Sequence, residues 1–444
     1  MKSVDQARSL AHDIVARATA AGADAADAVV SSHASLNVSV RLGNLEDVGR
    51  SEGEDLSLRV FCGKRNACVA TSDFGSGSLD ELVARAIRMA REAPEDKWAG
   101  LAPETRLLKG NPPLLDLDDG GMISPEDLRE RALEAEDAAR AVPGVTNSEG
   151  AGAGGSRSVM ALATSHGFAG GYTATSYGVQ ASVLAGEVGS MERDYAHHSA
   201  RHLRHLEQSA AIGRRAGERA VRRLNPGRVP SGSVPVVIDR RIGGSLLGHL
   251  VGAIAGPAIT RKTSFLLDSM GDAIFPGTVT IKDDPHRPQG LRSRPFDGEG
   301  LAVLPVCLVE NGHLQTWLLD SASARQLGME PTGHSARGGG VSASNLYMEA
   351  GNISVEALIG DIERGVWVTE LIGQGANLTT GDYSRGASGF LIENGKVTRP
   401  IAEFTVAGNL KAMFAALTPA NDLQFRYGIN VPTVRIDGMT VAGG

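Results

Sequence analysis

The chain has 444 residues, of which 42% are hydrophobic and 21% are charged, and its formal net charge is −7. A chain of this length can form two or three domains with a sizeable core. The acidic balance argues against a nucleic-acid backbone as the main partner, because proteins that bind one usually present a basic surface.

The N-terminal segment, residues 1–23, has charges throughout and no apolar core, so we expect neither a signal peptide nor a membrane anchor. No apolar run reaches the ~18 residues that a transmembrane helix needs. Three cysteines, Cys62, Cys68 and Cys307, are too few for a disulfide framework. Cys62 and Cys68 could face each other across a hairpin, but we expect reduced thiols and a cytoplasmic protein.

The first hundred residues predict an α+β domain, 1–100. Residues 3–21 have the pattern of an amphipathic helix that ends at Gly22. Short β-like runs follow, which predict an antiparallel meander. The runs cover 26–33, 35–42, 45–52, 55–62 and 65–72, with turns at Gly43-Asn44, Gly53 and Gly63-Lys64.

Two further helices are marked by their first residues. Ser78 and Glu81 have the spacing of a capping box for a helix over 79–93. After a proline-rich connector, Ser124-Pro125 begins another helix, because Ser caps and Pro fits the first turn.

The central region, 120–225, predicts an α/β unit. GAGAGG at 150–155 matches GxGxxG, but Ser158 to Thr164 resemble a strand rather than a helix, so we interpret the glycines as a flexible hairpin loop. His198 and His202 have helical spacing for a shared face, yet no carboxylate or Cys completes a metal set. The arginines of 213–224 predict the solvated face of a helix.

Residues 234–255 predict a buried strand, VPVVID, followed by a helix with Asp239 as its N-cap. Leu246, Leu250 and Ile254 form an apolar stripe at helical spacing. Glycines recur every four residues on another face. Each costs roughly 1 kcal/mol relative to Ala inside a helix, so we expect a neighbouring strand or a second chain to pack closely against that face. These glycines are Gly244, Gly248 and Gly252.

This segment resembles the active-site helix of the TldD/PmbA metallopeptidase family, and the chain is similar to the TldE (PmbA) type. Three long segments of the C-terminal region carry the same resemblance. In the TldD type, an HExxxH motif lies on this helix; here its positions hold Gly248, His249 and Ala253. The resemblance therefore implies no metal ligands and no general base on this chain, and zinc in a TldD-like partner. The similar segments cover 261–300, 314–328 and 381–410.

The C-terminal region, 230–444, predicts a Gly-rich, β-dominated domain. Its clearest hairpin turns at Asn394-Gly395, and we expect the strands on either side to offer main-chain groups to an added peptide strand. Arg385, preceded by Ser384, is suited to reach a peptide carbonyl or carboxylate; the alternative is a structural pair with Asp382.

Two loops complete the set of candidates for a substrate channel or a subunit interface. His286, Asp297 and Glu299 lie in turn-rich sequence that we expect to line a cavity. His334 and Arg337 flank the start of a glycine run, so we expect a mobile loop that could close over a chamber.

The sequence thus predicts an α+β protein that serves as the non-zinc support subunit of a heteromeric TldD/TldE-type metalloprotease. The resemblance implies small or unfolded peptides as substrates, including precursor peptides. The acidic net charge and the lack of a long apolar run predict neither nucleic acid nor membrane as partner. One alternative is a self-sufficient hydrolase using a serine with His249, His286 or His334 and an aspartate. The other is a peptide-binding or assembly protein without catalysis.

Overall fold

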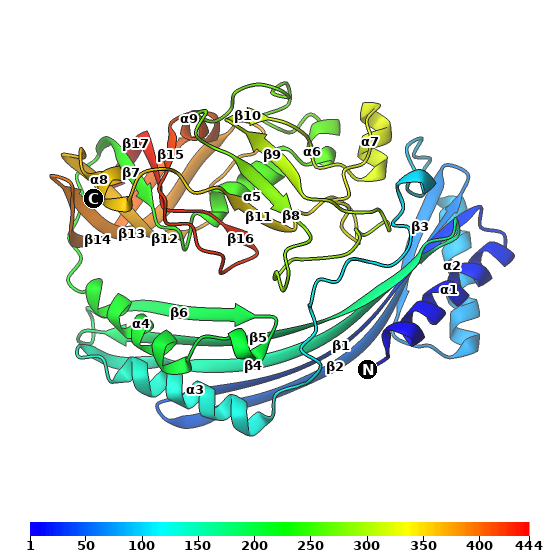
Figure 1. Cartoon of the computed structure of the whole chain (residues 1–444), viewed down its shortest axis with the longest axis horizontal. Coiled ribbons are helices and arrows are strands. Elements are labelled where there is room, and N and C mark those ends of the chain that lie inside the picture. The colour runs from blue at the N-terminus through cyan, green and yellow to red at the C-terminus, as the bar shows by residue number, and fades with distance from the viewer. Residues whose placement is uncertain (444) are drawn as a thin grey trace.

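A long curved antiparallel sheet carries helices on its convex face and a second, β-rich unit on its concave side (Figure 1). The computed structural model describes residues 1–443 and confirms the predicted α+β class. The helices are α1 (Val4–Ala20), α2 (Ser76–Glu92), α3 (Pro125–Arg140), α4 (Ser209–Arg222), α5 (Gly244–Ala253), α6 (Gly256–Thr260), α7 (Ser321–Leu327), α8 (Val355–Ile359) and α9 (Leu410–Ala415), with 3-10 turns at Glu104–Arg106 and Leu203–His205. No helix of these residues is both long and apolar enough to cross a membrane.

The curved sheet has the order β3-β2-β1-β4-β5-β6. Its strands are β1 (Ala25–Arg41), β2 (Asn44–Cys62), β3 (Arg65–Thr71), β4 (Val145–Thr164), β5 (Ala169–Ala185) and β6 (Glu192–Ala200). β1 pairs with β4 from Asp27↔Thr164 to Val40↔Ala151, so strands from 1–100 and from 120–225 form one continuous sheet.

The predicted meander is antiparallel as expected, but its strands are longer than predicted. The turns at Gly43-Asn44 and Gly63-Lys64 are confirmed. The break at Gly53 is wrong, because Gly53 pairs with His33 in the middle of the β1–β2 ladder. A Cβ on Gly53 would lie 2.4 Å from the His33 ring, so this glycine makes room for a neighbour rather than for a turn.

The hairpin loop predicted for GAGAGG at 150–155 is also wrong, because these glycines lie inside β4. Atoms of neighbouring residues occupy the space that a side chain would need at these positions. A Cβ on Gly154 would lie 2.2 Å from Asn37 Oδ1, and one on Gly155 would lie 2.7 Å from Ile123. The Ser158 to Thr164 strand is confirmed as the end of β4.

Cys62 and Cys68 do not face each other across the β2–β3 hairpin. Cys62 pairs with Arg65 and Cys68 pairs with Arg59, so the two thiols occupy different rungs. Both cysteines and Cys307 are free.

The helix ends partly follow the predicted signals. Ser3 forms a capping box with Gln6 at the start of α1, and Ser124 caps α3 with Pro125 in its first turn. The capping box predicted at Ser78 is wrong, because α2 begins earlier, after Gly75. The Ser78 hydroxyl instead donates to the Asp73 carboxylate at 2.6 Å.

Helices α1 and α2 cover one half of the convex face, and α3 and α4 cover the other (Figure 1). α4 approaches the backbone of α3 closely, since a Cβ on Gly213 would lie 1.9 Å from the Ala135 carbonyl oxygen. The solvated arginine face predicted for α4 is correct for Arg214, which is exposed. It is wrong for Arg223, which is buried and paired with Glu370 at 2.7 Å, because the β-rich unit packs over the end of this helix.

The β-rich unit contains two sheets around one core. In the first, β14-β13-β12-β7-β17-β15, a further pairing of β14 with β17 closes five strands into a small barrel. The second has the order β10-β9-β8-β11-β16. The strands are β7 (Gly232–Ile238), β8 (Ile281–Asp284), β9 (Val306–Glu310), β10 (His313–Leu314), β11 (Asn345–Met348), β12 (Arg364–Ile372), β13 (Asp382–Glu393), β14 (Lys396–Asn409), β15 (Leu417–Pro419), β16 (Ile429–Asn430) and β17 (Val434–Gly443).

The β13–β14 hairpin turns at Asn394-Gly395, where both residues have positive φ as a type I′ turn requires. Both of its outer edges are occupied, because β13 also pairs with β12 and β14 also pairs with β17. The expectation that this hairpin accepts an added peptide strand is therefore wrong.

The strand and helix predicted for 234–255 are present as β7 and α5, and Leu246, Leu250 and Ile254 are buried as expected. Asp239 is not the N-cap, because a tight turn separates it from the helix, which begins at Gly244. Its carboxylate instead accepts hydrogen bonds from the Arg241 backbone N–H at 3.0 Å and the Trp367 indole at 3.1 Å.

Candidate functional site

The concave face of the curved sheet is packed against the β-rich unit near Phe168 and Phe296 and is hollow farther along. A cavity of about 450 Å³ lies over β1, β4, β5 and β6. Side chains alternate across a strand, and the residues that face this cavity are small and polar. They include Asn37, Ser39, Gly152, Gly154, Ser156, Ser176, Gly178 and Gln180.

A second cavity of about 400 Å³ shares Ser39, Gly152 and Gln180 with the first, so the two form one groove along the sheet. Glu149 and Arg193 give this second part a charged rim. We call the combined hollow the concave groove.

The histidine-rich stretch borders this groove, but not on a helix. His197 and His198 lie on β6, while His202 follows it, so the predicted shared helical face is wrong. His198 Nδ1 accepts a hydrogen bond from the Glu207 backbone N–H at 3.1 Å. His202 is buried within 3.2 Å of Asp116 and 3.0 Å of Asp119, which explains it as a structural residue.

A second polar feature lies where α5 meets β13. The His249 ring packs edge-on against the Tyr383 ring, with centroids 5.8 Å apart. Burial, and then the charge of Arg385, lowers the pKa of His249, so the imidazole is neutral at pH 7. Burial raises the pKa of Tyr383, which keeps its phenol protonated.

Each of these three side chains has a buried polar atom that makes no hydrogen bond to residues 1–443: His249 Nε2, Tyr383 Oη and Arg385 Nε. Arg385 is held by one bond, from Nη2 to the Leu371 carbonyl at 3.2 Å. Gly248 beside them is exposed, and a Cβ built on it would meet no atom within 4 Å. The cluster thus offers hydrogen-bonding groups next to an open helix face, and we call it the α5 cluster.

The open face corrects one prediction about the helix glycines. Among residues 1–443 nothing packs closely on Gly248, although a Cβ on Gly252 would lie 2.6 Å from Leu378. Gly244 has ordinary contacts with Ile429, at 3.4 Å and beyond. Close packing of the whole glycine face by a strand of the same chain is therefore wrong.

The α5 cluster does not have the donors of a zinc site. A catalytic zinc takes three protein ligands from His, Cys and carboxylate, and His249 is the one residue of these types on α5. Within residues 1–443, no group of three or more His, Cys, Asp or Glu side chains is placed to hold a metal ion. A guanidinium and a protonated phenol next to His249 favour an acceptor group rather than a cation.

Asp382 and Ser384 do not join the α5 cluster, because alternate residues of β13 face opposite sides. Both are exposed. Asp382 accepts a hydrogen bond from the Thr380 hydroxyl at 2.7 Å, so the alternative pairing of Arg385 with Asp382 is wrong. Tyr383 was not predicted, although its spacing of two residues from Arg385 on a strand is the signal that could have found it.

His334 is buried rather than on a mobile loop. Its Nε2 lies 3.1 Å from Asp283 and its Nδ1 lies 2.9 Å from the Thr332 hydroxyl. Ser344 donates to the same Asp283 oxygen at 2.8 Å. The carboxylate therefore separates the imidazole from the hydroxyl, so His334 is not placed as the general base of a serine nucleophile.

Asp297 and Glu299 lie in a buried turn, as their sequence context predicts. Asp297 accepts backbone hydrogen bonds from Glu299, Leu301 and Ser335. Burial, and then the charge of Glu299, nevertheless raises the pKa of Asp297 to about 7. Glu299 lines a cavity of about 300 Å³, and Asp297 does not.

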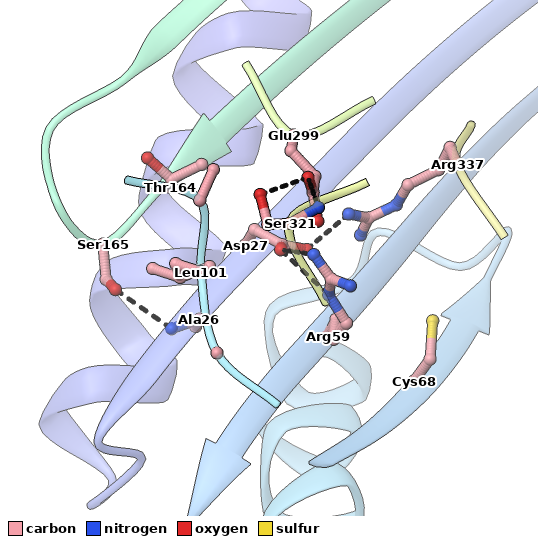
Figure 2. A network of polar contacts seen from close by, with 12 residues as sticks. Ala26, Asp27, Arg59, Cys68, Leu101, Thr164, Ser165, Glu299, Ser321 and Arg337 are labelled. Carbon is pink, nitrogen blue, oxygen red and sulfur yellow. Dashed lines mark hydrogen bonds and ion pairs between the residues drawn. The ribbon is translucent and has the colours of Figure 1, made fainter. Parts of the chain in front are cut away.

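Arg337 connects the β-rich unit to the curved sheet. It forms an ion pair with Asp27 on β1 and donates to the Ser57 carbonyl at 3.2 Å. Asp27 is also bound by Arg59 of β2, at 2.5 Å (Figure 2). We call Asp27, Arg59 and Arg337 the interdomain clasp. It fixes the β-rich unit over one end of the sheet, whereas the concave groove is lined by residues of the sheet alone.

Three family models match the chain in order: PmbA/TldA metallopeptidase domain 1 over residues 26–90, the central domain over 118–224 and the C-terminal domain over 231–443. The metalloprotease PmbA of Escherichia coli O157:H7 is 37% identical over 422 residues, covering 95% of this chain and 92% of its own. A PmbA homolog of Haemophilus influenzae is 34% identical, covering 96% and 94%. A TldD homolog of the same species is 26% identical over about half of each chain, 53% and 54%.

Solved structures have the same architecture. A putative modulator of DNA gyrase from Bacteroides thetaiotaomicron superposes with a TM-score of 0.92 at 28% identity, covering 99% of each chain. TldE from Thermococcus kodakarensis superposes with a TM-score of 0.86 at 22% identity, covering 98% of this chain and all of its own, which shows a shared fold.

Proposed function

Because the chain belongs to the PmbA/TldD metallopeptidase family, we propose that it is the support subunit of a two-chain zinc metallopeptidase that cleaves small or unfolded peptides. In this proposal a TldD-like chain carries the HExxxH motif and the zinc, and this chain holds and orients the peptide. The match to TldD homologs over about half of the chain supports a partner of related fold.

The observation that carries the proposal is the α5 cluster. It occupies the helix that resembles the zinc helix of the TldD type, yet it offers hydrogen-bonding groups to an acceptor instead of ligands to a cation. Each buried polar atom without a partner costs about 1–3 kcal/mol. A peptide carbonyl, from a substrate or from the partner chain, would supply the missing acceptor.

The concave groove supports a role in holding extended peptides. Its floor of glycine and serine leaves room for a chain with varied side chains. β6 is the edge strand of the sheet. Apart from the Tyr195 carbonyl, which Arg219 already contacts, its outer main-chain groups can pair with an added strand, and such bonds favour low sequence specificity. Precursor peptides and unfolded proteins have the extended segments that such a groove would take. The three free thiols support a reducing, cytoplasmic setting for this activity.

The test combines the purified chain with a TldD-like partner and a fluorogenic peptide. We expect hydrolysis from the mixture, its loss with a chelator, and none from this chain alone. Copurification of the two chains checks assembly separately. Hydrolysis by this chain alone, with bound zinc, would contradict the support role.

Tyr383→Phe gives a sharper test of the α5 cluster. This change removes only the buried hydroxyl, which faces Arg385 without the geometry of a hydrogen bond, so the unfolding free energy of the isolated chain should change by no more than about 1 kcal/mol. The assembled complex should show a raised KM, as should Arg385→Gln. Arg364→Gln, an exposed arginine on neighbouring β12, is the matched control and should change neither quantity. An unaltered KM for both cluster variants would remove the cluster from the peptide site.

A further inference from the structure

A separate cavity, of about 330 Å³, lies between α4 and the β-rich unit, and half of its lining residues are arginines. Its wall comes from α4, from the turn between β7 and α5, and from the loop before and within β16. We call it the arginine cavity. The arginines are Arg215, Arg219, Arg240, Arg241 and Arg426, and the other lining residues include Asp239, Gln424, Tyr427 and Asn430.

Some of these arginines are neutralised by carboxylates of the same chain. Arg215 and Arg426 share one carboxylate, Glu207, at 2.9 and 2.6 Å. Burial alone would raise the pKa of Glu207, but its hydrogen bonds from these two arginines outweigh burial and lower the pKa to about 2. One carboxylate therefore serves two guanidinium groups.

Two of the remaining arginines, Arg240 and Arg241, have a carboxylate partner, and Arg241 shares its partner with Arg223. Arg241 forms a bidentate pair with Asp194, at 2.8 and 3.0 Å, but Asp194 also contacts Arg223. Arg240 lies 3.6 Å from Asp422.

Arg219 has no carboxylate partner in residues 1–443, and its Nη1 donates to the Tyr195 carbonyl at 3.0 Å. Burial, and then the charge of Arg241, lowers the pKa of Arg219. The cavity thus has an excess of positive charge. Asp239 also lines the wall, but its two hydrogen bonds come from a backbone N–H and the Trp367 indole rather than from a guanidinium.

The arginine cavity adjoins the concave groove. His197 lines the groove, Tyr427 lines the cavity, and their rings lie 5.5 Å apart. The Tyr195 carbonyl, which Arg219 contacts, belongs to the edge strand β6. A peptide that lies along β6 would therefore reach the cavity at one end.

We propose that the arginine cavity binds a carboxylate of the extended peptide held in the groove, either its C-terminal carboxylate or an acidic side chain. A guanidinium presents a planar fork of donors that matches a carboxylate, and Arg219 is the group whose charge the chain leaves unpaired. This inference rests on the proposed peptide-holding role. It adds a direction for the bound peptide, because the contact with the carboxylate fixes which part of the peptide lies at the cavity.

The test measures the binding of N-terminally labelled peptides to the purified full chain by fluorescence anisotropy at low salt. Three peptides of one neutral sequence are compared: the free acid, the C-terminal amide, and the amide with one internal Glu. The variants are Arg219→Gln and the more exposed Arg240→Gln. Arg214→Gln is the matched control, because it removes the same charge from an exposed position of the same helix.

We expect Arg219→Gln and Arg240→Gln to weaken binding of a carboxylate-bearing peptide by about tenfold or more, as for loss of a hydrogen bond to a charged group. Arg214→Gln should change affinity by less than about twofold, since an exposed charge acts weakly. The amide without Glu should bind equally to all variants. Dependence on Arg219 for the free acid assigns the terminal carboxylate, and dependence for the Glu peptide assigns the side chain. If Arg219→Gln does not fold, Arg240→Gln decides.

Two results would overturn the proposal. One is equal affinity of the free acid, the amide and the Glu peptide for the unaltered chain. The other is competition by inorganic phosphate alone, with no dependence on peptide charge. In both cases peptide binding by the unaltered chain would leave the proposed function standing. No peptide binding by that chain would overturn both proposals.

Discussion

Replacing Arg337 with Gln should lower the free energy of unfolding by about 2 kcal/mol. Arg337 gives Asp27 an ion pair and donates a second hydrogen bond to the Ser57 carbonyl. Hydrogen bonds to charged groups contribute about 1.5–3 kcal/mol each. The Asp27 carboxylate is only 2% exposed but keeps Arg59 when Arg337 is lost. The loss should therefore stay below the 3–5 kcal/mol that follows when a buried charge has no partner at all.

Asp27→Asn should cost more, about 3 kcal/mol, because both guanidinium groups then lose their carboxylate. Urea unfolding followed by tryptophan fluorescence measures both variants. Arg8→Gln is the control: it removes the same charge from an exposed helix pair with Asp5, which contributes about 0.5 kcal/mol or less. The double variant completes a cycle, and we expect a coupling energy of about 1–2 kcal/mol between Asp27 and Arg337.

A coupling energy below about 0.5 kcal/mol, or a loss for Arg337→Gln no larger than for Arg8→Gln, would refute this reasoning. The clasp would then contribute no more than an exposed ion pair, and the packing of the two units would determine where its residues lie. A confirmed coupling would assign it to the contacts that hold the β-rich unit over the concave groove.

Two further predictions concern stability. The pKa of Asp297, about 7, lies above the ~3.9 of an exposed aspartate, so the folded protein holds this proton longer than the unfolded chain. The stabilisation is complete below about pH 4 and lost as pH rises through 7, by at most on the order of 4 kcal/mol. Urea unfolding should show a lower unfolding free energy at pH 8 than at pH 5 in the unaltered chain, and Asp297→Asn should remove this difference. The same pH dependence in the variant and the unaltered chain would contradict the assignment to Asp297. Gly248→Ala should stabilise the chain by up to about 1 kcal/mol, because the face is open. Gly213→Ala should destabilise the chain by at least about 1–3 kcal/mol, because the new Cβ meets the α3 backbone. If both substitutions shift the melting temperature in the same direction, helix propensity alone would account for their effects.

The sequence predicted most of the local structure where a single segment determines it. Amphipathic spacing located α1 and α5, and the Asn394-Gly395 pair located its hairpin. It failed where a distant residue decides. Gly53 has the pattern of a turn when the segment is read alone, but the His33 ring opposite it fills the space of a side chain. The glycines of β4 were misread for the same reason.

For the candidate site, too, the sequence predicted what one segment determines and failed where distant segments meet. That Gly248 and Ala253 carry no metal-binding group follows from the sequence of one helix, and the family resemblance gives these positions their meaning. The α5 cluster required the pairing of that helix with β13, and Tyr383 has no local signal beyond its alternation with Arg385. The arginine cavity could not be predicted, because its arginines come from three segments separated by long stretches of chain, and a charge excess appears only after their carboxylate partners are known.

The α5 cluster and the arginine cavity have one property in common: each has more donors than the chain supplies acceptors. The fold does not need the Tyr383 hydroxyl, since phenylalanine would fill the same volume without a buried polar atom. It does not need the charge of Arg219, which forms no ion pair with a carboxylate of residues 1–443. Arg240 and Arg241 directly precede the helix that carries His249, so the two sites are joined by one short segment. An extended peptide has a carbonyl at every residue and a carboxylate at its end. It is therefore the kind of ligand whose acceptor groups match the donors of both sites.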